Sequence, residues 1–479
     1  MSSSNLSALV GTLTLILCLV MIISGHLNKG AAEEIFVKDK NLKVQLVAEG
    51  LNQPTSMAFL GPDDLLVLEK EGKVQRIIGI NSQASTVLDV TNKVNSSYER
   101  GLIGIVIQSN GQASSNNSYD EPEMKNMYLY YTENVTDKSM TNESCLANEC
   151  PTIGNVENRL YKYQFEDGKL VNPTLMLSID LNDTSDFIHV GGIITIGPDD
   201  HIYLTAGDGK TCGYYEECRM IINGGPLDSQ TANSRDGHIA SGKGGILHLS
   251  QDNGQALYLK GILGDEYPLN LYYAYGIRNS FGIDFDPMTG LLWDTENGPA
   301  FGDEINLVEP GFNSGWTAFQ GIWPITNDSL LANDPPPGIA KGYFTFNEKL
   351  GNDNKPLYDF DGKGRYSQPE FTWNHTVGVT AIKFFNSEKF GDNYENDLFV
   401  GSYNGGFIYH FDLTDDRKQL LLKGVLLDKV ANTGKELSQV ALARGFGGIT
   451  DLEVSPDGNL YIVSITEGKI WRLVAQDND

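Results

Sequence analysis

The sequence is poor in basic residues. Its 479 residues include 35 lysines and arginines against 62 aspartates and glutamates, which gives a formal net charge of −27. Proteins that bind nucleic acid present a basic face to the phosphates, so this balance argues against a nucleic-acid partner. An anionic lipid surface is disfavoured for the same electrostatic reason.

Long apolar runs are absent beyond the amino terminus, where residues 8–25 carry no charge. This run is longer than a typical signal h-region of 7–15 residues and slightly shorter than the roughly 20 that span a bilayer. We therefore expect residues 1–33 to be a signal peptide or a membrane anchor with a short linker. The remaining chain is then extracellular or held at the cell surface. The alternative is a buried helix of the globular domain.

Cysteine is scarce, and its spacing agrees with export. Four cysteines lie outside the leader, as the close pairs Cys145/Cys150 and Cys212/Cys218. Four cysteines allow three pairings, and proximity favours two local disulfides, which persist in oxidising compartments. Zinc binding is the alternative, but CxxC spacing and neighbouring histidines are missing. Asparagines in Asn-x-Ser/Thr sequences are candidate glycan acceptors: Asn95, Asn116, Asn134, Asn142, Asn182, Asn327 and Asn374.

The sequence also lacks a long helical period and several widespread catalytic motifs. It contains no P-loop, no GxGxxG leading into a helix, no GxSxG and no HExxH. What it does contain is a recurrent unit, in which a turn rich in Pro, Asp or Gly leads into a short strand of Val, Ile, Leu, Tyr and Phe. Six copies begin near Gly61, Met127, Gly197, Asp286, Asn396 and Ser455.

Repeated turn-strand units without intervening helices are typical of propeller blades. We therefore predict an all-β fold, a six-bladed β-propeller that forms a single ring domain over residues 34–479. An irregular pair of β-sandwiches is the alternative. The polar stretches 108–126, 210–245 and 321–368 are expected to be loops that build the functional face.

Three groups of residues are candidates for chemistry. The first is His189, which precedes Gly191-Gly192, with Asp208 at the end of the next predicted strand. A histidine beside a carboxylate is a natural general base near neutral pH. The alternative is a hydrogen-bonded structural histidine.

The second group surrounds Arg278 in the segment 275–282, because arginine suits the recognition of planar carboxylates. A structural salt bridge is the alternative. The third is the segment 296–306, in which carboxylates, an amide and turn carbonyls are close together. Such oxygen donors suit a hard cation such as Ca²⁺, although the spacing is not that of an EF-hand. An acidic surface turn is the alternative.

Taken together and in order, these segments resemble the soluble glucose/sorbosone dehydrogenase family. The resemblance runs from about Leu46 to Leu473. It includes the sequences LNQPTSMAFL, ERGLIGIVI, MYLYYTEN, NRLYKYQF, HVGGIITIGPDDHIYLTAGDG, YAYGIRNSFGIDFDP, NGPAFGDEINLVEPGFNSGW and SPDGNLYIV. Members of that family are six-bladed propellers that carry pyrroloquinoline quinone and Ca²⁺ at the mouth of the ring.

The resemblance implies a role for each candidate residue. His189 matches the base that takes the sugar C1 hydroxyl proton, and Asp208 matches its carboxylate partner. Cofactor contacts are implied for Glu99, Arg278 and Asn279. The metal site is implied at the turn Gly298-Pro299, whose carbonyls match the Ca²⁺ ligands, with Asp303 and Glu304 as nearby carboxylates. The cofactor performs the redox chemistry, and the protein binds and orients it.

The sequence departs from the glucose-type pattern at several positions. Ile188 stands where those members have Asp before the histidine, and Phe281 where they have Gln. Cationic cofactor contacts are replaced by Asn404, Gly448 and Thr450. Because charge-assisted hydrogen bonds hold a tricarboxylate, these losses predict weaker quinone binding. Cations of nearby loops are candidates to compensate: Lys210, Arg219, Lys243 and Arg444.

The resemblance implies a quinone-dependent dehydrogenase that oxidises the C1 hydroxyl of an aldose to a lactone. Its partners are a small-molecule sugar and an external electron acceptor. Two alternatives use the same architecture, since fold alone does not determine function. One is a non-catalytic extracellular propeller that binds a glycan or a protein. The other is a Ca²⁺-dependent, lactonase-like hydrolase.

Overall fold

The computed structural model describes most of the chain beyond the leader. The described residues are 34–108, 125–135, 155–181, 188–209, 231–233, 240–251, 261–299, 301–324 and 357–476. The two cysteine pairs, the apolar run and most of the three predicted loops lie outside these ranges. The chain divides into two units, Met1–Phe36 and Val37–Asp479, and the second contains almost all of the described residues.

Strands dominate the described residues, and six of their sheets have four or more strands. The first two sheets contain consecutive strands. Sheet 1 has the order β3 (Pro54–Gly61), β4 (Asp64–Glu69), β5 (Lys73–Ile78), β6 (Ser85–Asp89). Sheet 2 has the order β7 (Leu102–Ile107), β8 (Lys125–Val135), β9 (Asn155–Glu166), β10 (Lys169–Asp180).

Sheets 3 and 4 each begin with antiparallel strands that are consecutive in the sequence. Short strands from later parts of the chain extend each sheet at its outer edge. Sheet 3 has the order β11 (Ile194–Ile196), β12 (His201–Ala206), β13 (Gly245–Ser250), β14 (Tyr272–Tyr275), β18 (Phe312–Asn313), β21 (Arg365–Tyr366). Sheet 4 has the order β15 (Ser280–Phe285), β16 (Leu292–Glu296), β17 (Asp303–Val308), β22 (Phe371–Trp373), β26 (Val430–Ala431).

The last two sheets contain the carboxyl-terminal strands. Sheet 5 includes β23 (Val379–Phe384), β24 (Leu398–Ser402), β25 (Ile408–Phe411) and β27 (Ala441–Arg444). Sheet 6 has the order β28 (Ile449–Val454), β29 (Leu460–Ser464), β30 (Lys469–Ala475), β2 (Leu42–Glu49). The remaining elements are small: β1 (Phe36–Val37), β19 (Phe319–Gln320), β20 (Trp323–Pro324), α4 (Gly434–Val440) and the 3₁₀ turns η1 (Leu269–Leu271), η3 (Glu388–Phe390) and η4 (Gly424–Asp428).

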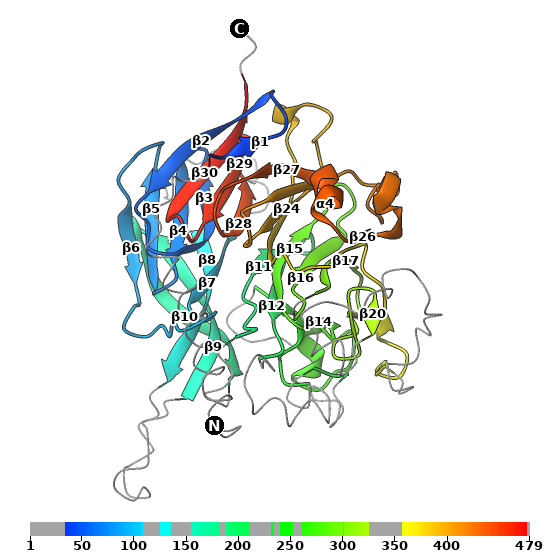
Figure 1. The fold of residues 1–479 in the computed structure, drawn as a ribbon. Coiled ribbons are helices and arrows are strands. Elements are labelled where there is room, and N and C mark those ends of the chain that lie inside the picture. The colour runs from blue at the N-terminus through cyan, green and yellow to red at the C-terminus, as the bar shows by residue number, and fades with distance from the viewer. Residues whose placement is uncertain are drawn as a thin grey trace, which may run out of the picture. The chain divides into compact units, whose positions relative to one another are not determined.

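The sheets follow one another in a closed ring (Figure 1). The first strand of each sheet lies against the first strand of the next, from β3 through β7, β11, β15, β23 and β28 back to β3. Apolar side chains such as Leu204, Trp293 and Val463 are fully buried and fill the space between sheets. The predicted all-β propeller arrangement is therefore confirmed. Among the described residues, no helix combines the length and hydropathy needed to cross a membrane.

The six repeated units of the sequence occupy equivalent places in this ring. Their strands are β4, β8, β12, β16, β24 and β29, each the second strand of its sheet. These strands are almost completely buried, as the patterns of β16 and β29 show. A strand buried on both faces reads as a continuous apolar run, which explains why these segments were recognisable in the sequence.

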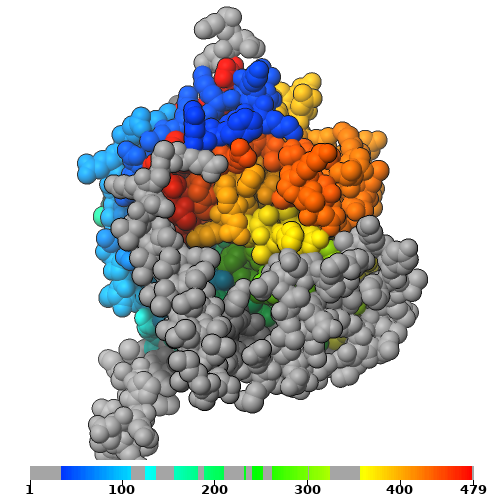
Figure 2. Space-filling view, viewed as in Figure 1, coloured from blue at the N-terminus to red at the C-terminus, as the bar shows by residue number. Residues whose placement is uncertain are grey.

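Sheet 6 joins the two ends of the ring. Its outer strand β2 pairs antiparallel with β30, so that Val44 lies opposite Leu473. The early strands, in blue, and the late strands, in red, lie side by side in both views of the molecule (Figures 1 and 2). Ring closure therefore depends on hydrogen bonds between strands from opposite ends of the domain.

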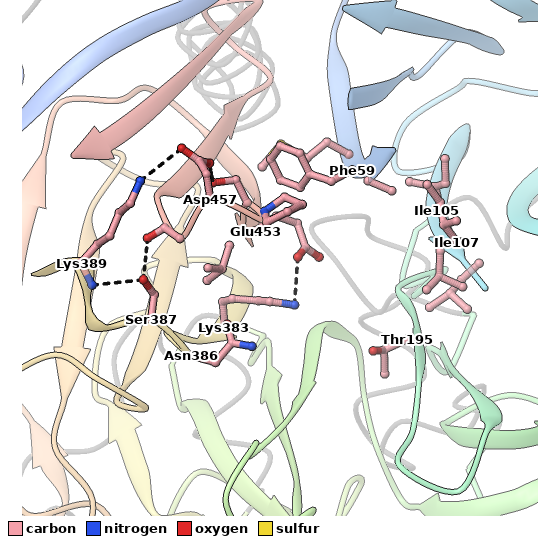
Figure 3. A pocket seen from close by; sticks show the side chains of 18 of the residues that line it. Phe59, Ile105, Ile107, Thr195, Lys383, Asn386, Ser387, Lys389, Glu453 and Asp457 are labelled. Carbon is pink, nitrogen blue, oxygen red and sulfur yellow. Dashed lines mark hydrogen bonds and ion pairs between the residues drawn. The ribbon is translucent and has the colours of Figure 1, made fainter. Parts of the chain in front are cut away.

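A cavity of about 660 Å³ opens at one end of the ring axis (Figure 3). It is bordered by residues of the inner strands, including Ile107 of β7 and Thr195 of β11. On its other side Lys383 forms ion pairs with Glu453 at 2.9 Å and Asp284 at 3.3 Å. Its size suits a ligand site, but the catalytic candidates lie at the opposite ends of these strands.

Candidate active site

The candidate residues come to one edge of the ring because of the strand order. Glu99 and His189 precede the inner strands β7 and β11, whereas Asp208 follows β12. Arg278 and Asn279 directly precede β15, and Gly298-Pro299 follows β16. In an antiparallel pair, the start of one strand and the end of its neighbour share an edge. The predicted residues therefore meet at the face opposite the 660 Å³ cavity.

His189 and Asp208 form a buried hydrogen-bonded pair. The distance from His189 Nδ1 to Asp208 Oδ1 is 2.7 Å, and the two side chains are 5% and 0% exposed. A carboxylate on Nδ1 fixes the ring orientation and the tautomer, and leaves Nε2 to accept a proton. Within the described residues no hydrogen bond engages Nε2.

The backbone of His189 adopts a conformation that is rare for a residue with a side chain. Its φ is 56°, in the left-handed region. Hydrogen bonds hold it there: its N–H donates to Glu99 Oε2 at 2.6 Å, and its carbonyl accepts from Gly209 N at 3.2 Å. Gly207 is required beside it, because a Cβ at that position would lie 2.2 Å from the His189 carbonyl oxygen. Such held strain is concentrated at functional sites.

Asp208 is fixed by partners on both of its oxygens. Oδ1 faces His189, and Oδ2 accepts from Trp316 Nε1 at 2.7 Å. Its backbone N–H donates to the Arg278 carbonyl at 2.8 Å, which joins sheets 3 and 4 at this point. Sequence reasoning missed the role of Trp316. The residue ends the quoted GFNSGW segment, but it lies more than a hundred residues after Asp208, so no local pattern links the two.

Glu99 and Asn279 brace the loop that carries His189. Glu99 Oε2 also accepts from Asn279 Nδ2 at 3.3 Å, and Asn279 Oδ1 accepts from Gly191 N at 3.2 Å. Glu99 therefore holds the backbone N–H of His189, and Asn279 holds the backbone N–H of Gly191. The cofactor contacts predicted for them remain predictions, and the structure adds a positioning role.

Arg278 lies inside the protein and is surrounded by carboxylates. Its Nη1 donates to the Asn297 carbonyl at 2.8 Å, and its guanidinium lies 5.5 Å from the ring centroid of Trp316. Burial lowers the pKa of Arg278, while Asp208, Glu99, Glu296 and Asp303 oppose that shift by stabilising the cation. Because it is buried and surrounded by carboxylates, the Arg278 guanidinium is a fixed positive charge beside His189 and Asp208.

The Gly298-Pro299 turn is held by Asp303. Gly298 N donates to Asp303 Oδ1 at 2.9 Å, and Val377 N and Gly378 N both donate to Oδ2 at 2.8 Å. Thr376 Oγ1 contacts both oxygens. Burial raises the pKa of Asp303, and these donors oppose the shift. Its oxygens are thus occupied by the protein, so Asp303 shapes the turn whose carbonyls are the predicted Ca²⁺ ligands.

Glu304 belongs to a second group of buried carboxyls. It lies opposite Glu296 in the β16–β17 pair, with Asp294 two residues away on the same face. Glu304 Oε1 accepts from Gln320 Nε2 at 2.9 Å, and Glu296 accepts from Ser314 Oγ at 2.5 Å and from Arg278 N at 2.7 Å. Burial, with repulsion from Asp294, raises the pKa of Glu296 to about 8. Burial, with repulsion from Glu296, raises the pKa of Glu304 well above its usual range. These contacts add no evidence for the predicted metal role of Glu304.

The residues that depart from the glucose-type pattern differ in their surroundings and in their exposure. A Cβ on Gly448 would lie 2.9 Å from the Tyr403 ring, so Tyr403 occupies the space that a side chain at 448 would enter. Asn404 is exposed, and Thr450 Oγ1 donates to the Pro54 carbonyl. Ile188 and Phe281 are both half-buried.

One of the four compensating cations is buried next to the site. Lys243 is 3% exposed, and the adjacent Gly244 hydrogen-bonds to Gly207 and Ile277, the neighbours of Asp208 and Arg278. Arg444 is exposed, and Lys210 and Arg219 lie outside the described residues. Of the four, Lys243 is therefore the buried cation that precedes a residue joined to both sides of the site.

The fold and the site together define a class of protein. It is a β-propeller with a buried histidine–carboxylate pair, an internal arginine and a carboxylate-braced turn at one mouth of the ring. The chain belongs to the Glucose / Sorbosone dehydrogenase family, whose model matches residues 51–351. All the predicted site residues, from Glu99 to Glu304, lie within that match.

Individual relatives agree with this assignment. The chain is 26% identical over 475 residues to quinoprotein glucose dehydrogenase B of Acinetobacter calcoaceticus, covering 91% of this chain and 88% of that one. An aldose sugar dehydrogenase of Escherichia coli is 29% identical over 192 residues, 40% of each chain. The PQQ-bound aldose sugar dehydrogenase of Streptomyces coelicolor shares the fold with a TM-score of 0.56 and 20% identity, covering 91% of this chain and 99% of that one.

Proposed function

We propose that the protein is a quinone-dependent aldose dehydrogenase. The observation that carries this proposal is the buried His189–Asp208 pair, held with a left-handed backbone beside the internal Arg278. Relatives described as a quinoprotein glucose dehydrogenase and as aldose sugar dehydrogenases support the same assignment.

In this proposal, Nε2 of His189 takes the proton of the sugar C1 hydroxyl, and Asp208 stabilises the imidazolium that results. Bound pyrroloquinoline quinone would accept the hydride from C1, which leaves the lactone as product. The electrons then pass to an external acceptor. Trp316 keeps Asp208 directed at His189 through its 2.7 Å hydrogen bond.

The residues present fit an anionic quinone with a bound cation. Arg278 provides a buried guanidinium, and Lys243 is the adjacent candidate for a second positive charge. The turn at Gly298-Pro299 is stabilised by Asp303, whose oxygens engage protein donors, so carbonyls of the turn are the proposed Ca²⁺ ligands. With Asn404, Gly448 and Thr450 in place of cations, quinone binding is expected to depend strongly on Ca²⁺.

We infer further that each of the six larger sheets is one propeller blade, since each supplies an inner strand to the ring.

We also propose that the chain is exported through residues 1–33, as a secreted or surface-anchored protein. Among the candidate glycan acceptors, Asn134 is exposed, whereas the Asn374 amide donates to Asn432 at 2.9 Å and is a poor acceptor site.

Purified protein mixed with pyrroloquinoline quinone and Ca²⁺ should gain a quinone absorption band and reduce a dye acceptor when an aldose is added. Omission of the quinone, or chelation of Ca²⁺, should abolish dye reduction. Absence of quinone binding at any Ca²⁺ concentration would favour the non-catalytic propeller. Hydrolysis of a lactone without quinone would favour the hydrolase.

A further inference from the structure

Three potential metal ligands meet at the opposite end of β12 from Asp208. Asp199 lies in the turn between β11 and β12, His201 is the first residue of β12, and His248 lies in β13. The strand register pairs His248 with Tyr203 and places His201 two residues away, so both imidazoles are on the same face of sheet 3. Seven residues of extended chain, about 20 Å, separate His201 from Asp208.

The three ligand atoms are close to one another. His201 Nδ1 lies 2.7 Å from His248 Nε2, and Asp199 Oδ2 lies 3.0 Å from His248 Nε2 and 3.1 Å from His201 Nδ1. The two imidazole rings are tilted by 55°, with their centroids 4.7 Å apart. Two nitrogens and one oxygen therefore form a nearly regular triangle.

The size of the triangle indicates a coordination geometry. Metal–nitrogen and metal–oxygen bonds to a divalent transition metal are about 2.0–2.2 Å long, so two ligands at right angles are about 2.9 Å apart. Tetrahedral angles would separate them by about 3.4 Å at the same bond lengths. The observed 2.7–3.1 Å fits three adjacent corners of an octahedron. Two histidines and one carboxylate in this facial arrangement leave other positions open.

Neighbouring groups orient the ligands. Tyr203 donates its hydroxyl hydrogen to Asp199 Oδ2 at 3.0 Å, and His201 N donates to Asp199 Oδ1 at 3.2 Å. The Tyr203 ring also stacks on His248, with 4.6 Å between centroids. Gly197 allows the turn to approach closely, since a Cβ there would lie 2.6 Å from Tyr203 and 2.7 Å from Asp199 Oδ1. Such outer contacts are typical of metal sites.

We propose that Asp199, His201 and His248 bind a divalent transition-metal ion, distinct from the Ca²⁺ proposed at Gly298-Pro299. Two nitrogen ligands favour a divalent transition-metal ion over Ca²⁺, which prefers oxygen donors only. The bound ion joins the β11–β12 turn to β13, and thereby stabilises sheet 3 at the edge away from the proposed active site.

Titration calorimetry of the whole protein with Zn²⁺, in millimolar Ca²⁺ to saturate oxygen sites, tests this proposal. The wild type should bind one more equivalent of Zn²⁺ than His248→Ala. Zn²⁺ should raise the melting temperature of the wild type but leave that of His248→Ala unchanged, because only the folded state holds the site. Asp199→Asn keeps the side-chain volume and should weaken the binding at least tenfold.

A second cluster provides the matched control. His410 lies 2.9 Å from Asp397 and 3.8 Å from Asp412, and offers one nitrogen where the proposed site has two. His410→Ala should retain the wild-type number of Zn²⁺ equivalents. If His248→Ala fails to fold, His201→Gln at the partly exposed start of β12 replaces it in the same comparison. Equal Zn²⁺ binding by the wild type and by the variant at His248 or His201, or no binding by the wild type, would overturn the proposal.

Discussion

At the scale of single residues, the proposed chemistry depends on His189. We expect His189→Ala to lower turnover by about 10²–10⁴-fold, because it removes the general base. The melting temperature should change by only a few degrees, since the loop keeps its Glu99 and Asn279 contacts. Steady-state kinetics with a dye acceptor measures turnover, and His410→Ala, on sheet 5, serves as the control. Equal activity of His189→Ala and the wild type would remove His189 as the base.

Arg278 governs the affinity for the quinone. Its buried guanidinium is held among carboxylates of the site, so Arg278→Glu should abolish quinone binding in calorimetry. Lys243→Met should weaken it by about one to two decades, as one charge-assisted hydrogen bond contributes roughly 1.5–3 kcal/mol. Tight binding that persists in Arg278→Glu and without Ca²⁺ would show that other groups hold the cofactor.

Asp294 links stability to pH. Both of its carboxyl oxygens are buried, and burial raises its pKa to about 7, although Asn306 and Ser280 oppose the shift. An unfolded chain releases this proton near pH 4, so the folded state loses stability as the pH rises from about 4 to 7. Below pH 4 both states are protonated, and the full stability is present.

We therefore expect Asp294→Asn to melt at a higher temperature than the wild type at pH 8 and at nearly the same temperature at pH 4. Thermal unfolding followed by circular dichroism across this range provides the comparison. A variant whose melting temperature is below that of the wild type at pH 8 would indicate that the ionised carboxylate has a stabilising partner, such as a cation.

Sequence patterns identified some of these residues and missed others for physical reasons. His189 and Asp208 were predictable because a single hairpin, β11 and β12, brings them together. The role of Trp316 was not, because its contact with Asp208 joins segments that are more than a hundred residues apart. The bracing role of Asp303 was also missed, since its partners Thr376–Gly378 lie on a distant loop.

At the scale of elements, the turn after β16 should control Ca²⁺ binding. A Cβ on Gly298 would lie 1.8 Å from the Phe301 carbonyl oxygen, so Gly298→Ala must open the turn. We expect Ca²⁺ to raise the melting temperature of the wild type and to have little effect on Gly298→Ala. Gly434→Ala is the matched control, because nothing lies within 4 Å of its added Cβ. An equal Ca²⁺ response in Gly298→Ala would place the ion elsewhere.

The strands themselves were the most predictable elements. The second strand of each sheet is buried and apolar, and a Pro-Asp or Gly turn precedes most of them, as at Gly197 before β12. The short outer strands β18, β21 and β26 were not predicted, because each has only two residues and depends on pairing with distant strands. Pairing of this kind leaves no local pattern in the sequence.

At the scale of the whole molecule, β30 completes the ring. It lies between β29 and β2, so its removal exposes both neighbours and opens the closed arrangement. A chain that ends after Gly468 should fail to unfold cooperatively and should aggregate, because unpaired strand edges recruit other chains. A chain that ends after Gln476 is the control and should melt like the wild type. Cooperative melting of the shorter chain would show that the ring is stable without closure.

The pairing of β2 with β30 also delays the completion of folding during biosynthesis. Their residues are separated by about 430 positions, from Leu42 to Ala475. At a synthesis rate of about 5–20 residues per second, β2 waits roughly 20–90 s for its partner strand to be made. During that interval an edge of the nascent ring has no native neighbour. A chaperone that shields unpaired β-edges is therefore expected to increase the yield of this protein more than that of a domain whose paired strands are consecutive.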